Sequence, residues 1–448
     1  MARRHLRRAR HSLFSPKAWK TRLVFWSGAV MVGIAAVLLA LGSDHANEQF
    51  QRLTEVSGYL PLLVCPLGFA LIGWLTVRYF PGAQGSGIPQ AMAALDMSEH
   101  TLRASVLSLR IACAKGVMIL LGLLSGASIG REGPTVHIGA AIMFVLGERA
   151  HFPKHDIERG LILAGGAAGI GAAFNAPLAG VVFAIEEMSR SFEERTSGTV
   201  LTAVIIAGMT AMALLGNYTY LGKATPVDWG PASAWLAALL CGLVGGLLGG
   251  AFSALLIWGN RRLRPLRQAH PALLPAVCGL AVACIGLGAA GLTYGTGYQQ
   301  ARQILGGEGV GHVGFPYLKM LATMVSYWSG IPGGIFAPSL AIGAGIGEQL
   351  AMLLAGFPAE GVALLAMAAY FTGVLQTPIT AFVIVSEMTD DHAFILPLMA
   401  ASFAAYGVSR LLCPEPLYRV LAEEFLQGPE DGTGTGTRPS QASPARSK

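Results

Sequence analysis

The chain has 448 residues, of which 53% are hydrophobic and 12% are charged, whereas a soluble domain carries about 25% charged residues. A chain with so few charged residues cannot cover a water-facing surface. A soluble globular protein is therefore excluded, and an integral membrane protein is expected. The net charge of +6 comes from the N-terminal residues, and the lack of a basic face elsewhere argues against nucleic-acid binding.

The first and last segments of the chain differ from the apolar part between them. Residues 1–22 hold eight Lys and Arg residues and no acidic residue. Because basic segments beside a membrane span stay inside the cell, we expect a basic cytoplasmic N-terminal arm there. Residues 428–448 are rich in Gly, Thr, Pro and Ser and are expected to form a disordered tail. The transmembrane domain is expected over residues 23–427.

Twelve apolar stretches divide this domain, and they predict an all-α polytopic membrane protein. Several reach the ~20 residues that span hydrocarbon as a helix, but 135–148 and 339–356 are short and follow Gly/Pro clusters. With 58 glycines in the chain, this pattern is typical of closely packed and broken helices. The stretches are 23–43, 59–78, 105–127, 135–148, 160–185, 199–221, 232–258, 272–294, 316–329, 339–356, 361–385 and 393–412.

One series of features occurs twice, 201 to 204 residues apart. A Gly-x-x-x-Pro motif is followed 43 or 40 residues later by a proline, and nine residues after that by a glutamate. The series therefore predicts an internal duplication, with repeat halves at roughly 23–221 and 231–412. Duplicated halves with broken helices are typical of transporters with a site between the repeats. The copies are Gly130–Pro134, Pro177 and Glu186, and Gly334–Pro338, Pro378 and Glu387.

Two Gly-rich motifs in the first half could bind anions. Gly85–Pro89 would expose backbone N–H groups before a helix, and Ser86 would add a hydroxyl donor, although an ordinary turn is favoured on spacing alone. In Gly130–Pro134, Glu132 is itself an anion at the positive end of a helix. It would compete there with a mobile anion. The alternatives are that Glu132 caps the helix or pairs with Arg131.

The later motifs offer a second anion site and a proton site. Gly333–Pro338 has Phe336 where the first copy has Glu132, so its N–H groups would bind an anion without a competing carboxylate, while the Phe336 side chain packs. Glu186 and Glu187 end an apolar run, where a carboxylate pair could relay protons. A solvated helix end is the alternative, and Glu387 is expected to be structural.

Three other polar residues have ordinary interpretations. Lys115 is expected to be a snorkelling or paired lysine rather than a ligand. His137 is off the helical face of Glu132 and is expected to pack. Tyr418 follows the last span, where a tyrosine is usually an interface anchor.

Together, these motifs resemble the CLC family of chloride channels and chloride/proton exchangers. They occur in the family's order from residue 85 to residue 418. The resemblance implies a homodimer in which each subunit has its own pathway and about 18 mostly membrane-embedded helices in two inverted halves. The matching segments are Gly85–Pro89, Gly130–Pro134, Ala173–Gly180, Glu186–Met188, Gly333–Pro338 and Tyr418.

The resemblance also implies roles for the matching residues. Glu132 would be the gate and external proton site, and Glu187, with Glu186 beside it, would be the internal proton site. Lys115 lies where the family often has a lysine near the pathway. Hydroxyl and backbone N–H groups would bind chloride, and they would come from Ser86, Tyr418, Ile335, Phe336, Gly133 and Ala337.

By the same resemblance, the expected function is chloride/proton antiport in a bacterial inner membrane, with both termini cytoplasmic. Ser86 favours chloride, because nitrate-preferring relatives tend to have Pro there. Glu187 favours exchange, because channel members usually lack this glutamate. A passive voltage- or pH-gated chloride channel is the alternative. An intramembrane enzyme is a remote one, because no metal-protease motif or Ser/His pair is found. Membrane lipid is an expected partner, and no metal or cofactor is expected.

Overall fold

The computed structural model describes residues 16–150, 156–189, 194–216, 220–222, 231–354, 357–389 and 394–426. Within these ranges the chain is helical, and β-type pairing is limited to two isolated bridges. The predicted all-α fold is confirmed. Residues 1–15 of the basic arm and the tail 428–448 lie outside the described residues.

The helices of the first half follow the apolar stretches with two differences. The first helix begins inside the basic arm, and two short helices, α4 and α5, were not expected from hydropathy. The elements are α2 (Pro16–Val56), α3 (Pro61–Tyr79), α4 (Ile88–Asp96), α5 (His100–Val106), α6 (Leu109–Leu124), α7 (Glu132–Arg149), α8 (Asp156–Phe174), α9 (Pro177–Phe183), the π-helical turn η1 (Ala184–Ser189) and α10 (Glu194–Leu215).

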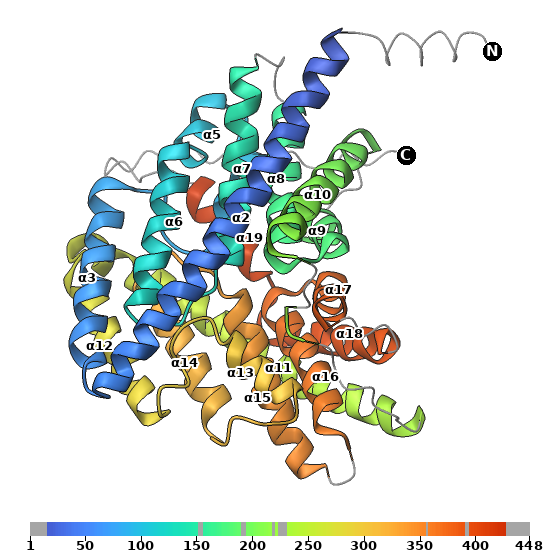
Figure 1. Cartoon of the computed structure of the whole chain (residues 1–448). Coiled ribbons are helices and arrows are strands. Elements are labelled where there is room, and N and C mark those ends of the chain that lie inside the picture. Colours follow the sequence, from blue (N-terminus) through green and yellow to red (C-terminus); the bar gives the residue numbers. More distant parts are fainter. Residues whose placement is uncertain are drawn as a thin grey trace, which may run out of the picture.

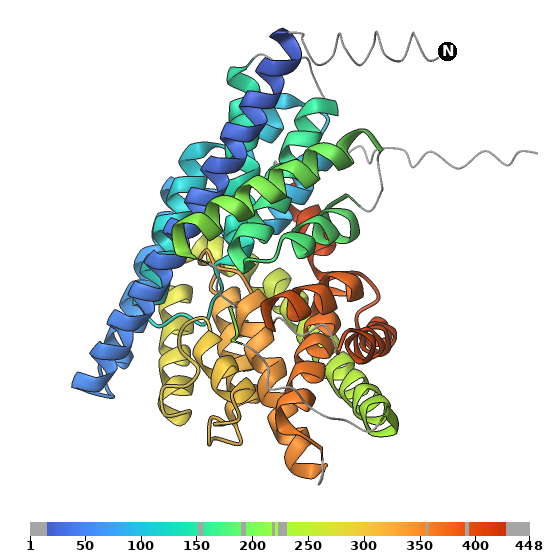
Figure 2. The ribbon, with the colours of Figure 1, turned by 45° about the vertical axis from the view of Figure 1, so that its right-hand side comes forward.

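The second half repeats the order of the main helices, with no described counterpart of α5, and ends with one additional helix. Its elements are α11 (Pro231–Ala269), α12 (Leu273–Gly288), α13 (Tyr298–Leu305), α14 (Phe315–Trp328), α15 (Phe336–Leu353), α16 (Ala359–Leu375), α17 (Pro378–Thr389), α18 (Ile395–Leu412) and α19 (Leu417–Leu426). Figures 1 and 2 show the first half, blue to green, above the second half, yellow to red. The last helix, α19, returns to the first half and packs against α4.

Two expected continuous spans are broken at equivalent places. The stretch 160–185 divides into α8, α9 and η1 after Asn175, whose φ is 53°, and the stretch 361–385 divides into α16 and α17 at Gln376, whose φ is 61°. A left-handed residue commonly ends a helix, and the prolines that follow, Pro177 and Pro378, begin the next one.

The outer surface is apolar, as expected for a protein in lipid. Among the described residues, eight helices are long and apolar enough to cross a membrane. Large apolar side chains stand exposed on them, where a soluble protein would have polar ones. Examples are Leu38, Leu63, Leu67, Met209, Trp258 and Leu396.

The two halves are related by an inversion that the backbone makes visible. Gly130 and Gly334, which directly precede the equivalent helices α7 and α15, form an antiparallel bridge. Each N–H donates to the other's carbonyl, at 2.7 and 2.8 Å. Reciprocal bonds between equivalent residues are what a two-fold axis between repeats produces. The predicted inverted duplication is therefore seen at the centre of the molecule.

Candidate functional site

Three glycine-rich loops meet between the two halves. The Gly85 N–H donates to the Ile331 carbonyl at 3.3 Å, and the Gly333 N–H donates to the Gly85 carbonyl at 3.1 Å. The pair Gly130 and Gly334 lies in the same set of loops. Because α4, α7 and α15 begin directly after these loops, three helix N-termini come together with their positive ends and unpaired N–H groups. The loops thus form a place suited to an anion, at the N-termini of α4, α7 and α15, and we call it the anion place.

Glu132 is fully buried in the first turn of α7. Its Oε2 accepts a hydrogen bond of 3.4 Å from the Ala337 N–H at the start of α15, and its Oε1 accepts one of 2.8 Å from the Tyr298 hydroxyl. A Cβ at Gly130 would lie 2.5 Å from Oε2, so this glycine makes room for the carboxylate. The carboxylate therefore occupies a helix N-terminus that could otherwise hold a free anion.

Arg131 makes its shortest contacts with α2 rather than with Glu132. Its Nε lies 4.0 Å from Glu132 Oε1. Its Nη1 donates to Asp44 Oδ1 at 2.8 Å and to the Ala40 carbonyl, both on α2, and its guanidinium lies over the ring of Tyr220. The ion pair with Glu132 considered from the sequence is therefore present only as a long contact of 4.0 Å, and the shorter contacts of Arg131 are with α2.

Ser86, in the loop before α4, and Tyr418, on α19, bring two hydroxyl groups to the same place. Both side chains are fully buried, so the expected interface anchor at Tyr418 is wrong. The hydroxyls interact with each other, but within the described part of the chain neither has a hydrogen-bond partner of regular geometry. Gly133 lies against them, since a Cβ there would be 2.1 Å from Ser86 Oγ. Buried hydroxyls are normally paired, so this pair marks a place for a polar ligand.

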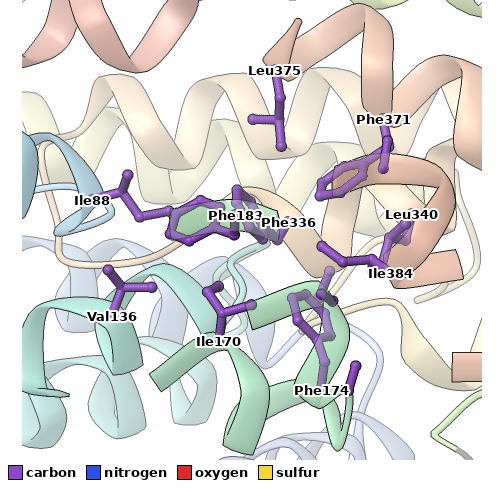
Figure 3. Close-up of a cluster of buried hydrophobic side chains, with 14 of the residues drawn as sticks. Ile88, Val136, Ile170, Phe174, Phe183, Phe336, Leu340, Phe371, Leu375 and Ile384 are labelled. Atoms are coloured by element: carbon purple, nitrogen blue, oxygen red, sulfur yellow. The ribbon is translucent and has the colours of Figure 1, made fainter. Parts of the chain in front are cut away.

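Ile335 and Phe336 lie at the start of α15, where the first N–H groups of a helix have no partner within it. The Phe336 ring lies in a cluster of buried apolar side chains (Figure 3), and its centroid is 5.9 Å from that of Tyr418. Its centroid lies 6.1 Å from those of Phe174 and Phe183 and 5.0 Å from that of Phe371. The Phe336 side chain therefore packs in the core, as expected, and anion binding by the backbone of this turn stays a prediction.

Glu186 and Glu187 have different surroundings because they lie in the π-helical turn η1, a feature often found at functional sites. Glu187 is fully buried and close enough to Tyr418 for electrostatic interaction. Glu186 Oε2 accepts hydrogen bonds from the Thr380 N–H at 2.6 Å and hydroxyl at 2.7 Å, and its Oε1 accepts one from the Ile379 N–H at 3.1 Å. Glu186 therefore caps α17, whereas Glu187 is a buried carboxylate near the anion place.

Glu387 makes the equivalent cap in the opposite direction. Its two carboxylate oxygens accept hydrogen bonds from Leu178 N–H at 3.1 Å and Ala179 N–H at 2.7 Å, in the first turn of α9. Each repeat thus caps a helix of the other through equivalent glutamates. The structural role expected for Glu387 is confirmed, and Glu186 has the same role.

Two cavities lie beside the site, and each is lined by basic residues that would attract anions. The cavity next to Glu132 has a volume of about 360 Å³, and its polar lining includes Asp44, Arg131, Tyr298, Gln299 and Arg302. The cavity next to the Gly85 loop has a volume of about 340 Å³, and its polar lining includes Gln84, Asn260, Arg264, Arg267 and Tyr327. An anion at the helix N-termini would have one cavity near each side of it.

The comparisons with known proteins agree on one family. The family described as voltage gated chloride channel matches residues 68–410. This chain belongs to the CLC family. Curated CLC relatives named H(+)/Cl(-) exchange transporter ClcA, from Yersinia pestis and Cronobacter sakazakii, are each 31% identical to it over 93% of the chain and cover 91% and 94% of their own lengths.

Solved CLC structures share the fold. A slow cyanobacterial Cl-/H+ antiporter superposes with a TM-score of 0.76 at 24% identity, over 92% of this chain and 99% of that one. A CLC-type fluoride/proton antiporter superposes with a TM-score of 0.74 at 25% identity, over 89% of this chain and 96% of that one. The arrangement of broken helices is therefore that of CLC transporters.

Lys115 and His137 are both fully buried in this CLC protein. Lys115 Nζ contacts the Gly85 carbonyl at 3.4 Å. Of the expected alternatives, a snorkelling or a paired lysine, burial excludes snorkelling, and the ammonium lies against the loop that carries Ser86. His137 Nε2 bonds to the Val106 carbonyl at 2.8 Å. The packing role expected for His137 is confirmed.

Tyr298 is a site residue that the sequence reasoning missed. It is the first residue of α13 and donates its hydroxyl proton to Glu132. The signal was a second copy of a motif, because Gly295–Gly297 reads Gly-Thr-Gly directly before Tyr298, as Gly85–Gly87 reads Gly-Ser-Gly before α4. Helix α13 lies outside the apolar stretches, so hydropathy gives no sign of this second copy.

Proposed function

We propose that this membrane protein exchanges chloride for protons. One observation carries the proposal: the Glu132 carboxylate sits on the Ala337 N–H at the start of α15, where a chloride ion would find the same donor. Two anions cannot occupy one donor site together. Protonation of Glu132 removes its charge and frees the site for chloride, so the movements of the two ions are linked.

The chloride ion would be held by donors without full positive charge, so that it can also leave. Ser86 and Tyr418 would supply hydroxyl groups, and Ile335 and Phe336 would supply backbone N–H groups. Gly133 and Ala337 lie at the same helix starts. The positive ends of α4, α7 and α15 add to the attraction. Basic side chains in the two flanking cavities would raise the local chloride concentration.

The proton would reach the inner side by a different route. Glu187 offers no donor to chloride when ionised, and a carboxylate beside the anion would repel it. We therefore assign Glu187 as the internal proton site. Glu186 accepts hydrogen bonds from backbone N–H groups at the start of α17, so we assign it as the residue that positions its neighbour Glu187. The aromatic cluster around Phe336 is apolar, so transient water would have to carry protons past it.

Chloride is the proposed substrate among small anions. The relatives from Yersinia and Cronobacter are named as chloride exchangers, whereas one similar structure is that of a fluoride/proton antiporter. Ser86, whose buried hydroxyl has no hydrogen-bond partner of regular geometry among the described residues, supports chloride over nitrate. The proposal needs no cofactor beyond the transported ions.

A passive chloride channel is the alternative, and a flux measurement separates the two. Purified protein in liposomes under a chloride gradient should give a reversal potential that shifts when a pH gradient is added, and should drive protons against their gradient. A reversal potential equal to the chloride potential at every pH gradient would establish a channel. The buried Glu187 favours the exchanger, because a channel needs no internal proton site.

We also propose a homodimer in a bacterial inner membrane, with both termini in the cytoplasm. The caps join α9 to α17 within one subunit, and large apolar residues stand exposed on this part of the surface, namely Leu178, Ile379 and Leu396. These residues would face a second copy or lipid. Light scattering of the detergent-solubilised protein should give twice the chain mass, and the mass of one chain would contradict the dimer.

A further inference from the structure

The carboxylate of Glu132 is held by two donors from the other half of the molecule. One is the Ala337 backbone N–H at 3.4 Å, and the other is the Tyr298 hydroxyl at 2.8 Å. The phenol makes the shorter bond, and both side chains are buried. A hydroxyl that donates to a carboxylate stabilises its ionised form more than its neutral form. Tyr298 is thus placed to act on the ionised, seated form of Glu132.

The loop before α13 holds Tyr298 in place. Gly297 begins the helix with a φ of 88°, and a Cβ there would lie 2.6 Å from Ala341 Cβ, so only glycine fits. Below the loop, the fully buried Lys319 donates from Nζ to the Thr293 carbonyl at 2.9 Å and the Gly295 carbonyl at 2.7 Å. The phenol is therefore fixed by a rigid, buried support.

The ring of Tyr298 is also held from the side of the cavity. Its centroid lies 4.5 Å from that of Tyr220, and the Arg131 guanidinium lies 5.9 Å from it. The ring thus lines the cavity of about 360 Å³ next to Glu132. A substitution at Tyr298 would therefore affect the point at which a proton or an anion from that cavity reaches Glu132.

In the part of the chain that the structure describes, few charged or titratable groups are near Glu132 besides Tyr298. Arg131, directly before α7, lies 4.0 Å away and binds Asp44 on α2. Tyr418 on α19 interacts with Glu132 at longer range. From α15, the direct contact is the backbone N–H of Ala337. Tyr298 is therefore the side chain that makes the direct hydrogen bond to the carboxylate.

We propose that Tyr298 is a positioning residue that latches ionised Glu132 over the anion place and so sets the pH at which chloride transport begins. The inference rests on the proposed role of Glu132 as the gate. While Glu132 is ionised, the phenol keeps it seated and chloride is excluded. When Glu132 takes up a proton, the charge that strengthened the bond is lost and the carboxyl can leave.

The test is chloride efflux from liposomes, measured across a range of pH for the wild type and for Tyr298→Phe. Phenylalanine keeps the ring on Tyr220 but removes the hydroxyl. The pH of half-maximal efflux should rise by about one unit, which corresponds to about a tenfold change in occupancy of the seated carboxylate. Efflux at neutral pH should rise accordingly. Tyr298→Met, which also removes the ring, should shift the midpoint in the same direction.

A matched control is Tyr294→Phe. Tyr294 lies in the same loop and is buried, but its hydroxyl donates to the Ala283 carbonyl at 3.1 Å and not to Glu132. This variant loses an equivalent hydrogen bond and should keep the wild-type midpoint. In a Glu132→Gln background, Tyr298→Phe should have no further effect on the pH dependence.

The outcomes separate this inference from the proposed function. If Glu132→Gln leaves chloride efflux dependent on pH, the role of Glu132 as the gate fails. If Glu132→Gln removes that dependence but both Tyr298 variants keep the wild-type midpoint or lower it, the gate stands and the latch is overturned. An equal upward shift in Tyr294→Phe would also overturn the latch, because the effect would then belong to the loop.

Discussion

Glu132 illustrates how far single residues can be interpreted from the sequence. Its place at the start of a broken helix predicted an anion that competes for a helix N-terminus, and the structure puts it on such a terminus. Its two donors, however, are 166 and 205 residues away in the chain. Spacing within one motif carries no information about partners in the other repeat, which is why Tyr298 was missed.

Ser86 gives a prediction at the same scale. Its hydroxyl lies with that of Tyr418 at the anion place, so Ser86→Pro removes a donor and should shift preference from chloride toward nitrate. Chloride binding should weaken by ~1.5–3 kcal/mol, the value of a hydrogen bond to a charged group. Uptake of the two anions into liposomes measures the preference. Ser86→Ala, which removes only the hydroxyl, controls for the backbone change, and an unchanged preference in folded Ser86→Pro would remove Ser86 from the site.

At the scale of elements, hydropathy predicted the spans but not their breaks. In 160–185 helix α8 ends just before Asn175, and in 361–385 helix α16 ends just before Gln376. A helix break that is buried in protein needs few polar residues, because neighbouring helices satisfy its backbone. The local signals are the left-handed Asn175 and Gln376 and the prolines two residues later, which are too few to lower the hydropathy of the whole stretch.

The reciprocal caps give a prediction about elements. Glu186 and Glu387 each accept two backbone N–H bonds at the start of a helix in the other repeat. Glu186→Ala and Glu387→Ala should each destabilise the fold by ~0.5–2 kcal/mol, the usual cost of losing a helix cap. Thermal unfolding in detergent should show comparable falls in Tm. A fall in only one of the two variants would mean that the caps are not equivalent.

At the scale of the whole molecule, the duplication reaches further than the motifs that revealed it. Lys115 and Lys319 are both fully buried, 204 residues apart in the chain. Each places its ammonium at backbone carbonyls of a Gly-x-Gly loop, Gly85 in one half and Gly295 in the other. One loop carries Ser86 and the other carries Tyr298. In the proposed mechanism, the two halves use the same arrangement of a buried lysine and a Gly-x-Gly loop for two purposes, one to bind the anion and the other to hold the carboxylate that competes with it.

The fold is consistent with the separate routes proposed for the two ions. Glu132 lies where the two repeats meet, and Glu187 lies in the π-helical turn η1. Chloride requires N–H and O–H donors, which the loops supply, whereas the proton requires carboxylates. The sequence identified both glutamates, but only the folded arrangement separates their surroundings.

Paired chloride and proton flux from liposomes, repeated across external pH, tests the central claim most directly. Glu187→Gln should lose proton transport and keep a chloride flux that still responds to pH, because Glu132 still titrates. Glu132→Gln, as the matched control, should lose proton transport and carry chloride independently of pH, because glutamine cannot titrate. Intact coupled proton transport in Glu187→Gln would contradict the account.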